Sequence, residues 1–156
     1  MKKSFLIVAI GILFAGLTHG QSVQEEIDYF QSIFGMGKKA VVAEFINPEG
    51  TGMESFWELY DQYEVTRKQM GQSRLELLYN YASDYGQQND DELDLMMKDI
   101  MKQRKSLDKL IDQYYKKIRK VSGSKAATQF YQIENYILSA IRLFILDEIP
   151  FIGEWE

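Results

Sequence analysis

Apolar side chains recur every three or four residues along most of the chain, which is the spacing of one face of an α-helix. The longest series steps by four and three residues in turn, without a break, from Leu93 to Val121. Its members are Leu93, Met97, Ile100, Arg104, Leu107, Ile111, Tyr114, Ile118 and Val121. A sustained average of ~3.5 residues is typical of coiled-coil-like packing. We therefore expect a long helix here that packs lengthwise against a neighbour.

A second series of the same spacing predicts a helix from about Met53 to Tyr85. Thr51 and Glu54 have the spacing of a capping box, in which each side chain accepts a hydrogen bond from a backbone amide of the other residue. Gly86 follows the helix, and glycine is the residue that most often ends one. The positions along the helix face are Phe56, Tyr60, Tyr63, Arg67, Met70, Arg74, Leu77 and Tyr81.

Two further helices complete the predicted fold. Residues 23–46 carry an apolar face and stop at Asn47-Pro48, because proline cannot continue a helix. Asn89 is suited to cap the helix of the longest series, and Ser122-Gly123-Ser124 separates that helix from a fourth over residues 125–147. The face of the first helix consists of Ile27, Phe30, Ile33 and Phe34. The sequence thus predicts an all-α fold, a long-helix antiparallel hairpin or bundle of about four helices with coiled-coil-like packing.

The N-terminus has the pattern of a cleaved secretory signal. Lys2 and Lys3 precede an apolar run from Phe5 to Leu17, and a small residue, Gly20, follows. The run has 13 residues, whereas a membrane span needs ~20, although an uncleaved anchor is the alternative. We expect residues 1–20 to be removed and residues 21–156 to form a single helical domain in the periplasm, with no membrane segment left. Because no cysteine follows the apolar run, a lipid anchor is excluded.

Removal of the signal limits the chemistry of the chain. His19 is the only histidine and there is no cysteine. Ser-His-Asp and Cys-His catalysis are therefore excluded, as are the usual ligands of zinc, copper(II) and haem. Without Lys2 and Lys3, the chain carries 16 basic and 23 acidic residues, a net charge of −7, which gives no reason to expect nucleic-acid binding. We expect a protein that is not an enzyme and needs no cofactor or metal.

Two clusters suggest a metal and have simpler explanations. The acidic residues Asp90, Asp91, Glu92 and Asp94 offer oxygen ligands for a divalent cation, but acids at a helix N-terminus also stabilise the helix dipole. The thioethers of Met96, Met97 and Met101 are soft ligands suited to copper(I). Methionine is equally a filler of hydrophobic cores, and we expect these three to lie in the core.

Aromatic and polar residues supply the remaining candidates. Tyrosine and tryptophan can line a surface for unfolded proteins or simply fill the core. Arg67, Arg74 and Arg104 interrupt apolar faces. Each can lie along its face with the guanidinium group in water, or pair with a carboxylate from a facing helix, such as Glu134. The polar residues around Glu134 are expected to hold buried backbone or arginine groups. The candidate interaction or structural residues are Phe56, Trp57, Tyr60, Tyr63, Arg67, Arg104, Phe130, Tyr131, Gln132, Glu134 and Asn135.

Four stretches resemble a group of small exported bacterial proteins without an established activity. They are MESFWELYDQYE (53–64), NYASDYG (80–86), YYKKIRKVSGSKAATQFYQIEN (114–135) and DEIPFI (147–152). The layout is more distantly similar to the periplasmic Spy/CpxP family, whose signature is LTxxQ at two helix starts. NPEGTGMESF and VSGSKAATQF occupy those starts here, and neither is an LTxxQ.

The more distant resemblance implies a curved helical hairpin that forms homodimers. It also implies either an ATP-independent chaperone for partly folded proteins or an accessory protein of the envelope stress response. The alternative is a regulatory subunit that binds a membrane sensor kinase or an anti-sigma factor. Metal-sensing members of the family use histidine-rich sites, and this chain has none after residue 20.

Overall fold

The computed structural model describes residues 37–46, 52–83 and 86–148, and these residues are helical apart from short connections. They contain three helices, which span residues 37–45, α3 (Gly52–Ser83) and α4 (Asp90–Glu148). No strand occurs among them, so the predicted all-α class is confirmed. The predicted bundle of about four helices remains a prediction, because residues 1–36 lie outside the described part. The expected signal, the face from Ile27 to Phe34 and the Thr51 cap lie there or in the gap at 47–51.

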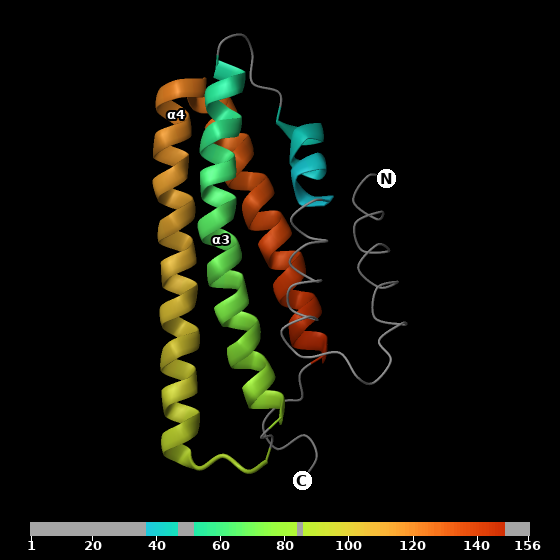
Figure 1. Ribbon diagram of the computed structural model, residues 1–156, viewed down its shortest axis with the longest axis vertical. Helices are drawn as coiled ribbons and strands as arrows, with labels where there is room; N and C mark the ends of the chain where they lie inside the picture. The colour runs from blue at the N-terminus through green and yellow to red at the C-terminus, as the bar shows by residue number, and fades with distance from the viewer. Residues whose placement is uncertain (1–36, 47–51, 84–85, 149–156) are drawn as a thin grey trace.

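Helix α4 reverses its direction at Gly123, where the backbone has φ 82° and ψ 170°. Only glycine readily adopts this combination, since any Cβ would clash. The reversal divides α4 into a first arm, residues 90–122, and a second arm, residues 124–148. Figure 1 shows α3 and the two arms running side by side, with the first arm antiparallel to both α3 and the second arm. The predicted helix break at Ser122-Gly123-Ser124 is thereby confirmed.

The start of α3 lies against this reversal. The Ser122 hydroxyl donates a 2.7 Å hydrogen bond to the carbonyl oxygen of Gly52. A Cβ on Gly52 would lie 3.2 Å from both the Ser122 Cα and the Val121 carbonyl oxygen. The close approach therefore depends on the missing side chain at Gly52.

The core fills the end of the bundle next to Gly123. Aromatic rings dominate it, and the Tyr63 ring meets the Phe130 ring edge-on at 5.1 Å between centroids, an arrangement that rings favour. The helix over residues 37–45 covers one side with Val42 and Ile46, both buried. The core residues are Val42, Ile46, Phe56, Tyr60, Tyr63, Leu110, Ile111, Tyr114, Ile118, Ala126, Ala127, Phe130, Ile133 and Ile137.

The long apolar series on α4 is buried only in its middle part. Ile111 and Ile118 lie in the core, whereas Met97 is 41% and Val121 47% exposed. Met101 is 53% exposed as well, so the expectation that Met97 and Met101 lie in the core is wrong. Burial decreases toward the start of the first arm, where Leu93 and Ile100 are only partly buried.

Hydrogen bonds at the helix ends agree with the predicted caps. Asn89 and Glu92 form a reciprocal pair, in which each side chain accepts from the backbone amide of the other at 3.1 and 3.0 Å. Gly86 has φ 75°, and the Gln88 amide donates to the Tyr81 carbonyl near the end of α3. Within the described ranges, every helix is too short or too polar to cross a membrane.

Candidate functional site

Four charged side chains meet inside the core. Lys38 donates from Nζ to Glu64 Oε1 at 2.5 Å and to Glu134 Oε2 at 2.7 Å. Arg67 donates from Nε and Nη2 to the two oxygens of Glu64, at 2.7 and 3.0 Å. All four residues are buried, and Glu134 is fully so. Two cations thus neutralise two anions, which is the condition under which charges persist in a protein interior.

We define the ion cluster as Lys38, Glu64, Arg67 and Glu134, and the hydroxyl groups of two tyrosines contact it. The Tyr63 hydroxyl donates to Glu134 Oε2 at 2.7 Å, and the Tyr60 hydroxyl makes a longer contact of 3.4 Å with Oε1. Burial and the nearby Glu134 carboxylate raise the pKa of both phenols well above the ordinary value. Both hydroxyl groups therefore keep their protons at neutral pH and can donate to Glu134.

Burial and ion pairing shift the pKa values of the charged residues in the cluster in opposite directions. Burial lowers the pKa of Lys38, and the attraction of Glu134 only partly offsets this. Burial alone would raise the pKa of Glu64, but Lys38 and Arg67 together bring it below its ordinary value. Burial alone would lower the pKa of Arg67, and the hydrogen bonds to Glu64 more than reverse it. The carboxylate of Glu64 is therefore held in its charged form.

The spacing of these residues explains how three helices contribute to one cluster. Tyr60, Tyr63, Glu64 and Arg67 lie at i, i+3, i+4 and i+7 on α3, which places them on one face. The second arm of α4 supplies Glu134, one turn beyond Phe130. The helix over residues 37–45 supplies Lys38, one turn before the buried Val42. This arrangement joins the three helices.

The predicted pairing of Glu134 with an arginine is wrong. Glu134 accepts hydrogen bonds from Lys38, Tyr60 and Tyr63, while Arg67 pairs with Glu64 on its own helix. The prediction missed Lys38 and Glu64. No signal in the sequence singles out Lys38, because a second lysine, Lys39, follows it directly.

The other predicted residues divide between core and surface. Phe56 and Phe130 are buried with Tyr60 and Tyr63, and Trp57 is half-buried beside them. Asn135 donates to the Tyr131 carbonyl one turn earlier, and Gln132 is exposed. Gln129, next to the predicted group, donates to the Phe45 carbonyl at 3.0 Å and so binds the end of the helix over residues 37–45.

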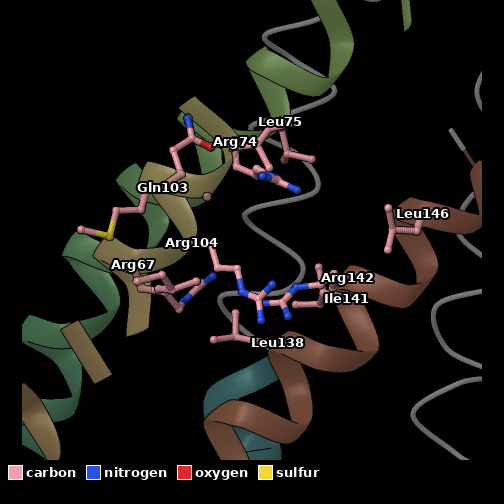
Figure 2. A pocket seen from close by; sticks show the side chains of 13 residues that line it. Arg67, Arg74, Leu75, Gln103, Arg104, Leu138, Ile141, Arg142 and Leu146 are labelled. Atoms are coloured by element: carbon pink, nitrogen blue, oxygen red, sulfur yellow. The ribbon is translucent and has the colours of Figure 1, made fainter. Parts of the chain in front are cut away.

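A pocket of about 220 Å³ opens where burial decreases, between α3 and the two arms of α4. Figure 2 shows Arg104 and Arg142 reaching toward each other across it, with Arg74 beside them. Arg67 also lines it, on the side of the ion cluster. The remaining walls are mostly aliphatic: Met70, Gly71, Leu75, Ile100, Gln103, Leu107, Leu138, Ile141 and Leu146. We call this space the arginine pocket.

Among the described residues, the arginine pocket carries positive charge without a paired carboxylate. No carboxylate is among its lining residues in the described part of the chain. Arg67 pairs with Glu64, but Arg74, Arg104 and Arg142 have no ion pair with any described residue. Burial and the repulsion of Arg142 lower the pKa of Arg74. The site can therefore attract an anion, and its walls offer hydrocarbon contact.

Over the described ranges, the carboxylates do not gather in any group of three or more that could hold a metal ion. Asp90, Asp91, Glu92 and Asp94 are exposed in and beyond the first turn of α4. No protein-family model, curated protein or solved structure matches the chain.

Proposed function

We propose that the protein is an exported, non-enzymatic binding protein that holds an anion with an apolar portion in the arginine pocket. The observation that carries the proposal is the set of Arg74, Arg104 and Arg142, which share one pocket and have no ion pair among the described residues. Like charges held together without a counter-ion destabilise a fold. A bound anion would offset this repulsion and use the guanidinium groups as donors.

The ion cluster supports the proposal through rigidity. Arg67 belongs to both features, because its guanidinium pairs with Glu64 and also lines the arginine pocket. The cluster fixes α3 against the second arm of α4, which carries Arg142. A binding site on fixed helices loses little conformational entropy when a ligand arrives.

Fluorescence of 8-anilinonaphthalene-1-sulfonate, an anion with apolar rings, tests the proposal. The folded protein should bind it and raise its emission. Arg104→Gln and Arg142→Gln should each weaken binding about tenfold, since one hydrogen bond to a charged group contributes about 1.5–3 kcal/mol. Arg119→Gln is the matched control, because Arg119 is an exposed arginine on the same arm as Arg104 and lies outside the pocket. Equal binding by all four proteins would refute the proposal.

A second candidate function is chaperone-like contact with partly folded proteins, as the resemblance to the Spy/CpxP family implies. Exposed apolar side chains on the first arm favour it, and Leu95, Met97 and Met101 are 61, 41 and 53% exposed. Phe56, Tyr60, Tyr63 and Phe130 are buried in this conformation, so clients would use the first arm instead. Binding to a membrane sensor kinase or an anti-sigma factor is the alternative on the same surface.

Suppression of aggregation of a denatured model protein tests this second candidate. Met97→Gln with Met101→Gln should reduce the suppression, whereas Arg142→Gln should not. No suppression at several-fold molar excess would reject chaperoning, and co-purification of one membrane protein would favour the regulatory role.

A further inference from the structure

We infer that the ligand of the arginine pocket is a single-chain amphiphile, with one hydrocarbon tail and a carboxylate or phosphate headgroup. The inference rests on the proposed function and adds the chemical class of the ligand.

The walls are suited to an alkyl tail. All three helical segments around the pocket contribute aliphatic side chains: Met70 and Leu75, Ile100 and Leu107, and Leu138 and Ile141. The lining contains no aromatic ring within the described residues, so a nucleotide base would have nothing to stack on. Flexible aliphatic walls adapt well to a flexible chain.

The size of the pocket points to one tail. An engineered protein cavity of ~150 Å³ holds a benzene molecule, so 220 Å³ has room for about nine carbon atoms. Two acyl chains would exceed this space. An acidic peptide would bring backbone amides and carbonyls that each need a hydrogen-bond partner. Gln103 is the sole neutral polar side chain among the described lining residues, so few such partners exist.

The guanidinium groups determine the headgroup. Arg104 and Arg142 come from opposite arms of α4 and approach each other across the pocket (Figure 2). A guanidinium matches the two oxygens of a carboxylate or phosphate, and it binds them with paired hydrogen bonds. One such headgroup between the two arginines would accept hydrogen bonds from both guanidinium groups and reduce their repulsion, while the tail lies along the aliphatic walls.

Calorimetric titration with alkyl carboxylates and alkyl phosphates of six to fourteen carbons tests the inference, at concentrations below micelle formation. Each added methylene should tighten binding about fourfold, since its burial contributes about 0.8 kcal/mol. The gain should level off near nine or ten carbons, when the tail reaches the end of the pocket. Comparing the two headgroups at one chain length shows whether fatty acids or phosphate monoesters are preferred.

Three controls separate the contributions. The alcohol of equal chain length should bind at least tenfold more weakly than the anions, as should acetate and inorganic phosphate, which lack a tail. Arg104→Gln and Arg142→Gln should remove the preference for the anion over the alcohol, and Arg119→Gln should keep it. Leu138→Ala should instead weaken every long-chain ligand and leave that preference intact.

Equal affinity for alcohol and anion, or an affinity that is independent of chain length, would overturn the inference. Failure of all the amphiphiles to bind would overturn it too. The proposed function would survive that failure if the anilinonaphthalene sulfonate still bound in a manner dependent on Arg104 and Arg142. The two ideas therefore fail separately.

Discussion

Individual residues in the ion cluster depend on one another because all four are buried. Lys38 has a side chain 2% exposed, and Glu134 one that is not exposed at all. Removing one partner of a buried pair leaves the other charge without compensation, which is far more costly than losing a surface pair. The neighbouring residue Lys39 offers a direct comparison, since it pairs with Asp61 at the surface.

Lys38→Met should lower the free energy of unfolding by about 3–5 kcal/mol, because Glu134 loses its only cationic partner among the described residues. Lys39→Met should cost at most about 1 kcal/mol, since its pair with Asp61 is solvated. Urea unfolding followed by circular dichroism measures both. Adding Glu134→Gln to Lys38→Met should recover part of the loss, and an unchanged or larger loss would contradict the electrostatic explanation.

Glu64 makes the free energy of unfolding depend on pH in the acidic range. Its pKa is lowered from 4.5 in the folded state, so the unfolded chain takes up the proton first as pH falls. The stability due to Glu64 is therefore complete above pH 4.5 and is lost as pH falls through the folded pKa. The difference in thermal midpoint between the wild type and Glu64→Gln should be largest above about pH 5 and should shrink as pH falls below about 4.5. A difference that is constant over this range would contradict the assignment, and Glu58→Gln, at an exposed position, is the control.

The residue scale also shows where prediction from sequence stops. Spacing along a helix tells which side a residue faces, so a buried polar role for Glu134 could be predicted. The partner of Glu134 is Lys38, 96 positions earlier in the chain. Nothing in the sequence distinguishes Lys38 from the adjacent Lys39, because the difference arises only when three helices assemble.

At the scale of elements, local signals were sufficient for the helix ends. The predicted helix from Met53 to Tyr85 is observed as Gly52–Ser83, and the Asn89 cap is present. These features depend on residues within one turn of each other, which the sequence displays directly. How much of the apolar series from Leu93 to Val121 is buried depends instead on how closely the helices approach one another. For that reason the sequence wrongly placed Met97 in the core.

Gly123 and Gly52 control the reversal of α4 for different reasons. Gly123→Ala should cost about 1–3 kcal/mol, because φ 82° and ψ 170° suit glycine alone. Gly52→Ala should also destabilise, although alanine normally favours a helix, because its Cβ would press on the backbone of residues 121 and 122. Differential scanning calorimetry of both variants measures the effect, with Ser124→Ala as the neighbouring control. A stabilised Gly52→Ala protein would show that the contact with the reversal is not close.

The whole molecule has two unlike ends. Next to Gly123, the three helices close over aromatic rings and a neutral ion cluster. Toward the other end, the arms of α4 enclose the arginine pocket and leave Leu95 and Met101 exposed. The closed end supplies stability and rigidity, which allows the open end to carry charges that oppose folding. Sequence periodicity treats both ends alike, so it did not reveal the pocket.

This division of roles predicts a stability gain where function is lost. Arg74 is repelled by Arg142, and neither has an ion pair with a described residue. Arg142→Gln should therefore raise the midpoint of thermal unfolding slightly, by about 1–3 °C, while it weakens anion binding. Sulfate or phosphate at millimolar concentration should raise the thermal midpoint of the wild type more than that of Arg142→Gln. An anion bound in the pocket stabilises the folded protein, and the variant lacks one of the guanidinium groups that would bind it. If Arg142 were a structural residue, its replacement would lower the midpoint of thermal unfolding. Arg119→Gln is the control, since it removes an arginine outside the pocket.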